Sequence, residues 1–193
     1  MPRKRIAFVG VKGLPSKAGA DRVVEALVTR LDRERFEPVV YCSAAVVPAG
    51  TQLPGVRLVR IHALPGKHLH ATSLFLFAAL HALFLGRYDL VHLHNVEASY
   101  VLPLLRLRFK VISTSHGPAQ KREKWGAVAR KLIQLMEWPY VRFSNAVTSV
   151  SLPLAEQYED EYGRRVYFIP NGVDEAEAVD LDAAAALLDG IDV

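Results

Sequence analysis

Polar side chains that can bind a ligand follow two of the predicted strands. His94 and Asn95 come directly after an apolar strand at residues 89–93. His116 follows another predicted strand at residues 110–114. Parallel strands end at the same edge of a sheet, so both strand ends can face one crevice. Because an imidazole can donate to a hydroxyl or a phosphate oxygen, we expect His116 to bind a ligand there, whereas His94 and Asn95 could either bind it or serve the structure of the sheet.

Neighbouring side chains limit the chemistry of this crevice. Glu97, just past Asn95, is the one acidic residue that we expect near it. His92 is expected to pack inside the sheet or to bond to backbone. No third ligand stands at a recognisable spacing from the histidines, so no metal site is predicted. No carboxylate pair, Ser-His-Asp set or Cys-His pair stands out either, and the sequence does not favour nucleophilic catalysis.

The loop after the first strand, residues 10–20, contains glycine and lysine. Gly13 and Gly19 would let the backbone approach a phosphate, and Lys17 would add positive charge. The helix that follows contributes free N–H groups and the positive end of its dipole. The loop therefore predicts a phosphate-binding site, with an ordinary turn between strand and helix as the alternative. Neither G-x-G-x-x-G nor a P-loop motif is present, which disfavours NAD and ATP.

A basic run with a tryptophan begins a later helix. It contains Lys121, Arg122, Lys124 and Trp125. Such a helix can rest on an anionic membrane surface or meet a pyrophosphate-linked acceptor. The alternative is a solvated helix face, with Trp125 folded onto the core.

Composition sets the class of protein. A chain of 193 residues with 51% hydrophobic side chains can bury one sizeable core. The net charge of +4 favours an anionic partner without selecting one, and we expect no nucleic-acid partner. A single cysteine, Cys42, excludes an internal disulfide framework and favours the cytoplasm. The longest apolar stretch, residues 74–85, is far shorter than the ~20 residues of a membrane-spanning helix.

Short apolar runs alternate with longer segments of helical periodicity, which is typical of a parallel sheet covered on both faces. We therefore predict an α/β fold, with a Rossmann-like open, mostly parallel sheet. Strands are expected at residues 5–10, 38–43, 56–61, 89–94, 110–115, 146–150 and 165–169. Helices are expected at residues 19–35, 72–86, 97–107 and 121–143, and after a cap at Ser151. The helix at 72–86 should be mostly buried, and the one at 121–143 should turn Leu135 inward and kink or shorten at Pro139.

Four segments of the chain resemble the N-terminal domain of retaining GT-B glycosyltransferases of family 4, in particular a rhamnosyltransferase-like branch. The segments are Gly10-Val11-Lys12-Gly13-Leu14-Pro15 with Gly19 and Glu25, Val91-His92-Leu93-His94-Asn95, Ser115-His116-Gly117, and Ile169-Pro170-Asn171-Gly172-Val173-Asp174. This branch often has a Gly-Gly pair where the present chain has Gly19 and Ala20. The order and spacing of the four segments over nearly the whole chain carry the resemblance.

The resemblance implies a division of labour between two domains. Residues 1–174 would be the acceptor-side domain, and residues 175–193 a linker or the start of a donor-binding domain that is absent. The whole enzyme would transfer a sugar, with retention, from a nucleotide-sugar donor to a glycan or lipid-linked acceptor, with neither a metal nor a further cofactor. It would be cytoplasmic, or peripheral at the inner face of the membrane. In this family the first loop approaches the donor diphosphate, which points to Gly13, Gly19 and Lys17, and the residue matching His116 contacts the reacting sugar. His94, Asn95 and Glu97 would then contact the acceptor.

Two other functions fit the same residues. One is a carbohydrate-binding module without catalysis, in which the crevice holds a glycan and no transfer occurs. The other is a sugar-nucleotide epimerase of similar architecture, which would need an acidic catalytic residue near the crevice. Glu97 is the one candidate for that role.

Overall fold

The computed structural model describes residues 2–16, 19–66, 69–117 and 127–172. Within these ranges, the strands are β1 (Lys4–Val9), β2 (Phe36–Ser43), β3 (Arg57–Ile61), β4 (Leu90–His94), β5 (Val111–Ser115), β6 (Ala146–Ser149) and β7 (Tyr167–Phe168). The helices are α1 (Gly19–Arg30), α2 (Leu69–Leu85), α3 (Leu102–Arg106), α4 (Ala127–Phe143) and α5 (Leu152–Tyr162), with a 3-10 helix η1 (Val96–Val101) before α3.

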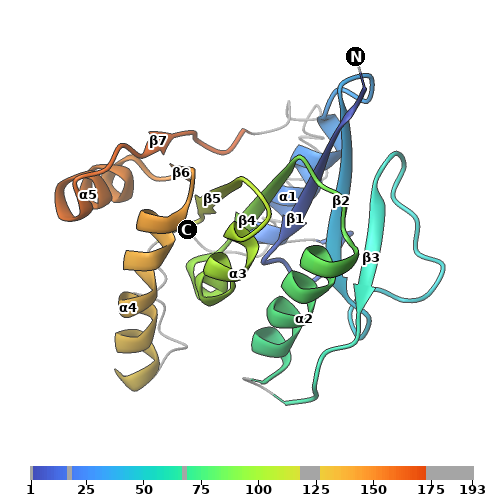
Figure 1. Ribbon diagram of the computed structural model, residues 1–193, viewed down its shortest axis with the longest axis horizontal. Coiled ribbons are helices and arrows are strands. Elements are labelled where there is room, and N and C mark those ends of the chain that lie inside the picture. The colour runs from blue at the N-terminus through green and yellow to red at the C-terminus, as the bar shows by residue number, and fades with distance from the viewer. Residues whose placement is uncertain (1, 17–18, 67–68, 118–126, 173–193) are drawn as a thin grey trace, which may run out of the picture.

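The described strands form one parallel sheet of seven strands in the order β3-β2-β1-β4-β5-β6-β7 (Figure 1). The chain builds outward from β1 to β3 and then returns to place β4 on the other side of β1. Loops that leave β1 and β4 therefore diverge, and a crevice is expected at the carboxyl ends of these two strands. The predicted fold class, a Rossmann-like parallel α/β sheet, is confirmed.

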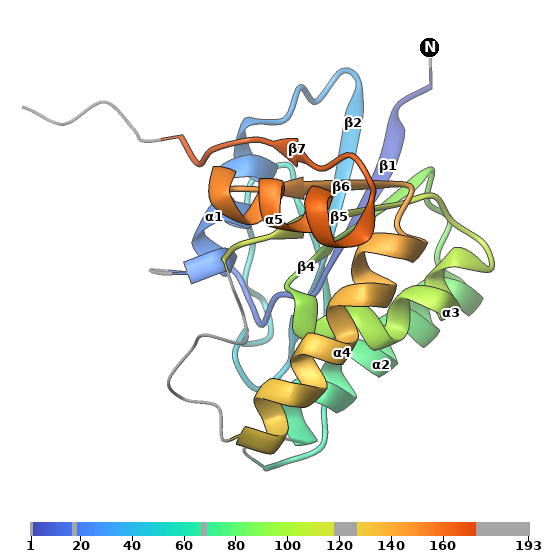
Figure 2. The same cartoon turned by 90° about the vertical axis from the view of Figure 1, so that its left-hand side faces the viewer.

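Alternating side chains of the strands face two separate cores. On one face, Ala7 and Val9 of β1 pack with α2 and α3, and on the other, Ile6 and Phe8 pack with Val24 of α1. Figure 2 shows α2, α3 and α4 on one side of β1 and β4, with α1 on the other. This alternation follows from the two-residue period of a strand. A third cluster joins η1, α4, β6 and α5.

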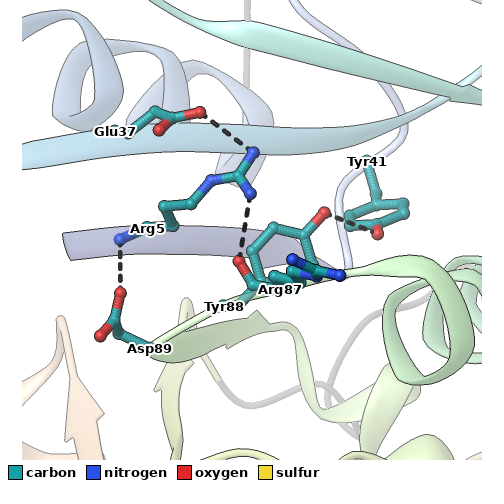
Figure 3. Close-up of polar contacts among 6 residues, drawn as sticks. All are labelled: Arg5, Glu37, Tyr41, Arg87, Tyr88 and Asp89. Atoms are coloured by element: carbon teal, nitrogen blue, oxygen red, sulfur yellow. Dashed lines mark hydrogen bonds and ion pairs between the residues drawn. The ribbon is translucent and has the colours of Figure 1, made fainter. Parts of the chain in front are cut away.

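The amino ends of β1 and β4 are joined by polar contacts (Figure 3). The carboxylate of Asp89 accepts hydrogen bonds from the backbone N–H of Arg5 at 2.9 Å and from Lys4 Nζ at 2.8 Å. The Arg5 guanidinium forms an ion pair with Glu37 at 3.1 Å and donates to the Arg87 carbonyl. These contacts hold the register of β4 against β1, and the same register brings the far end of β4 beside Gly10.

Several local predictions differ from the structure. Helix α1 ends at Arg30 rather than at residue 35, because Asp32 accepts from the N–H groups of Glu34 and Phe36 in a turn. Ser151 precedes α5 as predicted, but its side chain makes no capping hydrogen bond. Leu135 was predicted to face inward and is 64% exposed.

The predictions for two helices agree with the structure only in part. Helix α4 ends at Phe143 as predicted, so Pro139 does not shorten it. Arg164 donates to the carbonyls of Val141 and Arg142 at the end of this helix, which satisfies groups that lack a partner within the helix. Helix α2 buries only one face, and Phe84 near its end is 73% exposed.

Candidate functional site

The crevice begins at Gly10, directly after β1. Gly10 has a φ of 98°, and a Cβ at this position would lie 1.9 Å from the carbonyl oxygen of His94. Its carbonyl accepts a hydrogen bond of 2.8 Å from Asn95 Nδ2. Asn95 itself has a φ of 69°, which is uncommon for a residue with a side chain. Only glycine fits at position 10, and the Asn95 amide ties the end of β4 to the end of β1.

His94 and His116 form a hydrogen-bonded pair at this edge of the sheet. The distance from His94 Nδ1 to His116 Nε2 is 2.9 Å, and the two rings stack with centroids 5.2 Å apart. His94 lies opposite Thr114 in the register of β4 and β5, so the ring of His116, two residues later, points to the same face. The structure therefore brings together two side chains that the sequence placed at separate strand ends.

Burial keeps His94 uncharged. Its side chain is 1% exposed, with the ring of Phe8 stacked at 6.0 Å and the ring of His92 at 4.1 Å. Desolvation lowers the pKa of His94 well below its usual value of 6.5, and His92 and His116 lower it further. At neutral pH the pair contains at least one neutral imidazole, which presents one donor and one acceptor.

His92 begins a row of polar side chains across three strands. Its Nε2 lies 2.6 Å from Thr114 Oγ1, and Thr114 Oγ1 lies 2.6 Å from Thr148 Oγ1. Desolvation lowers the pKa of His92 to about 4, so this ring is also neutral. The expectation that His92 packs in the sheet is confirmed, but its partner is a threonine hydroxyl rather than backbone.

The first loop is braced by carboxylates from α1. Asp21 Oδ2 accepts from the N–H groups of Lys12 at 3.1 Å and Gly13 at 3.2 Å, and Glu25 Oε2 accepts from that of Ser16 at 2.7 Å. Burial raises the pKa of Asp21, and the two backbone hydrogen bonds oppose that rise. A phosphate can therefore reach the Lys12 and Gly13 amides only by displacing Asp21.

The two glycines predicted for donor phosphate have different surroundings. A Cβ on Gly13 would lie 2.6 Å from Val47 Cγ2 and 2.9 Å from Val46 Cγ1, so packing alone explains a glycine there. Gly19 begins α1 with a φ of 67° and open space beside it. Of the two, Gly19 offers the more accessible backbone, and its role in phosphate binding stays a prediction.

The remaining predicted site residues are Glu97, two residues after Asn95, and five that lie outside the described residues. Glu97 is in η1, and its charge helps to raise the pKa of Tyr140 in α4, a shift caused mainly by burial. Glu97 thus lies close to Tyr140, and its contact with the acceptor stays a prediction. Lys17 and the basic run of Lys121, Arg122, Lys124 and Trp125 lie outside the described residues.

Two residues of the crevice were missed from the sequence. Gly10 was seen only as the start of a loop, although a glycine directly after a strand is itself a signal of close backbone approach. Asp21 was not singled out, because nothing in a linear pattern tells a helix carboxylate to turn back toward the preceding loop.

A buried carboxyl group lies near the end of β5. Glu137 of α4 is 1% exposed, and its Oε1 accepts a hydrogen bond of 3.0 Å from Tyr158 Oη of α5. Desolvation raises the pKa of Glu137 to about 7; repulsion from Glu161 adds to the rise and the Tyr158 hydrogen bond opposes it. Tyr158 also interacts with Ser115, the last residue of β5. No pattern in the sequence singles out this group, because it belongs to a helix of ordinary periodicity.

In the described ranges, no three His, Cys, Asp or Glu side chains gather as metal ligands would. Within the same part of the chain, no helix has both the length and the apolar character to cross a bilayer.

The sequence matches one family and the fold matches several solved structures. The model of the family described as Glycosyltransferase Family 4 matches residues 18–177. No curated protein matches the sequence significantly. Sucrose-phosphate synthase from Thermosynechococcus elongatus is similar with a TM-score of 0.71 at 22% identity, over 96% of this chain and 52% of that protein. HepE from Anabaena, in complex with UDP and glucose, is similar with a TM-score of 0.63 at 16% identity, over 97% of this chain and 50% of that protein.

The present chain spans about half the length of these two solved structures. At such low identity, the similarity shows the fold alone. It agrees with the fold expected from the sequence, the N-terminal half of a GT-B architecture.

Proposed function

This chain belongs to glycosyltransferase family 4, and from that premise we propose that it is the acceptor-side half of an enzyme that transfers a sugar from a nucleotide-sugar donor to a glycan or lipid-linked acceptor. The observation that carries the proposal is the convergence of Gly10, His94, Asn95 and His116 at the point where the strand order reverses. Open parallel sheets bind their ligands at that point. HepE was solved with UDP and glucose, which makes UDP-sugars the first donors to test.

We propose that transfer retains the anomeric configuration. The acceptor hydroxyl oxygen bonds to the anomeric carbon on the face from which the diphosphate departs. As the bond to the diphosphate breaks, a departing phosphate oxygen takes the acceptor proton. The residues around the crevice suit this reaction, because neutral imidazoles can hold sugar hydroxyls and the step asks for no carboxylate nucleophile. We include in this proposal that the enzyme belongs to the rhamnosyltransferase-like branch that its sequence resembles.

A donor-binding domain following residue 174 completes the proposed enzyme. Calorimetric titration of residues 1–193 with UDP-, GDP- and dTDP-sugars tests the division of labour. We expect dissociation constants of about 1 mM or weaker, since half of the donor contacts would be missing. Micromolar binding by residues 1–193 would contradict this part of the proposal.

His116 is the residue to test for catalysis. In the protein extended by its donor-binding domain, His116→Ala should lower kcat/KM for sugar transfer by about 100-fold, because a hydrogen bond that strengthens at the transition state would be lost. His62→Ala is the matched control, since His62 is an exposed histidine after β3, at the far edge of the sheet. If both variants transfer sugar at the same rate, His116 does not act on the substrate.

We also propose that α4 rests on an anionic membrane surface or lipid-linked acceptor. Lys131 is exposed, Leu135 is 64% exposed and Trp138 is 52% exposed, at a spacing that puts them on one face of the helix. A face with apolar side chains and a lysine suits the headgroup region of a bilayer.

Vesicle co-sedimentation tests this surface. We expect binding to vesicles with phosphatidylglycerol and little binding to pure phosphatidylcholine. The double variant Leu135→Ser, Trp138→Ser should bind several-fold more weakly, whereas Leu64→Ser, which changes an exposed leucine after β3, should not. Equal binding by the double variant would remove α4 from the membrane contact.

A further inference from the structure

A second polar contact at the carboxyl edge of the sheet lies across β1 from His94 and His116. Ser43, the last residue of β2, and His70, in the first turn of α2, are joined by a hydrogen bond of 2.9 Å between Ser43 Oγ and His70 Nε2. Strand β2 lies directly beside β1. The N–H of Ser43 donates to the Lys12 carbonyl of the first loop at 2.7 Å. The contact between Ser43 and His70 therefore adjoins the first loop.

The hydroxyl of Ser43 is completely buried. Ser43 is 0% exposed, and its Oγ accepts a hydrogen bond of 3.2 Å from the N–H of Ala45. Within the part of the chain that the structure describes, the other side-chain partner of this oxygen is His70 Nε2. A hydroxyl has one hydrogen to donate and two lone pairs. The imidazole is therefore the acceptor that is available there for the Ser43 hydrogen.

The direction of the hydrogen bond between Ser43 and His70 follows from this burial. If His70 Nε2 carried a proton and donated, the Ser43 oxygen would accept twice and its own hydrogen would be buried without an acceptor. If Ser43 donates to Nε2, the hydrogen and the oxygen of the hydroxyl are both paired, and a neutral His70 carries its proton on Nδ1. Buried donors without a partner are costly, so the second arrangement is favoured.

The other ring nitrogen of His70 is open to solvent. The residue is partly exposed, and no hydrogen bond of its Nδ1 is found among the described residues. Nδ1 is also not one of the buried atoms that lack a partner in that part of the chain. The hydrogen bond at one nitrogen of an imidazole sets the proton position at the other, which is how proteins orient functional histidines. In the favoured arrangement, His70 therefore presents an N–H group to accessible space.

A second histidine of α2 also bonds to a hydroxyl of β2, but at a different place. His81 lies about 16 Å further along α2 by the rise of a helix, toward the amino edge of the sheet. Its Nδ1 lies 3.0 Å from Tyr41 Oη, which also lies 2.9 Å from Tyr88 Oη. Tyr41 is buried in the core that α2 covers. Of these two histidines, His70 is the one at the edge where open parallel sheets bind ligands.

We propose that His70 is a binding residue for the acceptor, and that it donates its Nδ1–H to a hydroxyl oxygen of the acceptor sugar while Ser43 fixes the proton there. A glycan and a lipid-linked sugar both present such hydroxyls. The acceptor site then extends from the crevice across β1 to the end of β2. Adjacent strands are about 4.8 Å apart, so β2 and β4 are about 10 Å apart, a span that suits an acceptor larger than one sugar ring. The bound sugar's role as acceptor rests on the proposed function, whereas the proton position and the sugar contact do not.

Nitrogen-15 NMR of the 193-residue chain, labelled at histidine, measures the proton position. Two-bond nitrogen–proton correlations distinguish Nδ1–H from Nε2–H. At about pH 8, where histidine side chains are ordinarily neutral, we expect His70 in the Nδ1–H form, and finding it as Nε2–H would overturn the proposal. Ser43→Ala removes the donor and should release His70 to a mixture of both tautomers. If His70 stays in the Nδ1–H form in the folded variant, Ser43 does not set it.

Two substitutions of His70 separate the sugar contact from the contact with Ser43. His70→Gln places an amide oxygen near the position of Nε2, so it can keep the hydrogen bond from Ser43 but lacks the Nδ1 donor. His70→Asn places an amide N–H near the position of Nδ1 and loses the contact with Ser43. If the role of His70 is structural alone, the glutamine variant should behave like wild type. If His70 binds the sugar, the asparagine variant should keep more of the binding.

NMR titration of the 193-residue chain with methyl glycosides of glucose, mannose and rhamnose measures sugar binding. We expect at least one of them to shift the His70 ring resonances of the wild type. His70→Gln should bind that glycoside about 10-fold more weakly, because one hydrogen bond is lost. His81→Asn, which keeps an amide near the position of Nδ1 and lies away from the carboxyl edge, is the matched control and should bind like wild type. Equal binding by wild type and His70→Gln, or no binding of any of the three by wild type, would overturn the sugar contact.

Activity separates this inference from the proposed function. In the protein with its donor-binding domain, with the bound methyl glycoside as acceptor, His70→Gln should raise KM for the glycoside by about 10-fold with little change in kcat or in KM for the donor. An absence of sugar transfer in every protein would refute the proposed function and leave the tautomer and the glycoside binding standing. An unchanged KM for the glycoside in His70→Gln, with transfer present, would refute the role of His70 in acceptor binding.

Discussion

Glu137 gives the sharpest quantitative prediction. Its carboxyl group is 1% exposed in the cluster that joins α4, β6 and α5, with Tyr158 Oη as hydrogen-bond donor at 3.0 Å. Desolvation raises its pKa from 4.5 to about 7. Glu137→Gln keeps the size and the acceptor oxygen but is uncharged at every pH, so the variant isolates the cost of a buried negative charge.

The sign of the effect follows from proton linkage. The folded pKa of Glu137 lies above the unfolded value, so the folded state binds the proton more tightly. As pH rises from 4.5 toward about 7, the unfolded chain ionises first and the free energy of unfolding of the wild type falls. Above about pH 7 both states are ionised and the loss is constant. At about 1.4 kcal/mol for each pH unit, the full loss is about 3 kcal/mol.

Urea unfolding of wild type and Glu137→Gln across about pH 5 to 8.5 measures this loss. The stability of the variant relative to wild type should rise by about 2–3 kcal/mol across that range, with equal m-values. The change with pH is the diagnostic quantity, because the added amide N–H groups contribute a constant offset.

A matched variant provides the control. Glu156→Gln changes an exposed glutamate on α5, and its stability relative to wild type should not vary with pH. If the difference between wild type and Glu137→Gln is also independent of pH, Glu137 is not held neutral by burial and the reasoning fails.

Two further predictions concern the crevice. Gly10→Ala should lower the free energy of unfolding in urea by about 3 kcal/mol or more, because its Cβ would meet the His94 carbonyl. Gly163→Ala is the control: this glycine also has a positive φ but open space beside it, and the loss should be only about 1–2 kcal/mol. Equal losses in the two variants would contradict the close approach at Gly10. Asp21→Ala should speed amide hydrogen exchange at Lys12 and Gly13 by about 10-fold, as both N–H groups lose their acceptor, and unchanged exchange would show that the loop is held by other contacts.

Periodicity made most of the fold predictable. Strands and helices alternate at the expected places, because two- and 3.6-residue patterns report which face of each element is buried. The structure differs from the predictions at particular residues. Asp32 ends α1 with a turn, and Leu135 stays exposed although its spacing matches an inward face.

The sequence indicated which residues gather at the candidate site, but not which contacts they make there. The order of the strands along the chain was enough to predict that His94 and His116 lie at one edge of a parallel sheet. The hydrogen bond between the two rings, and those from the Lys12 and Gly13 N–H groups to Asp21, became evident only in the folded chain. The burial of Glu137 was likewise decided by packing between α4 and α5. The physical reason is that periodicity reports burial along one chain segment, whereas a hydrogen bond between segments depends on register and packing that no single segment encodes.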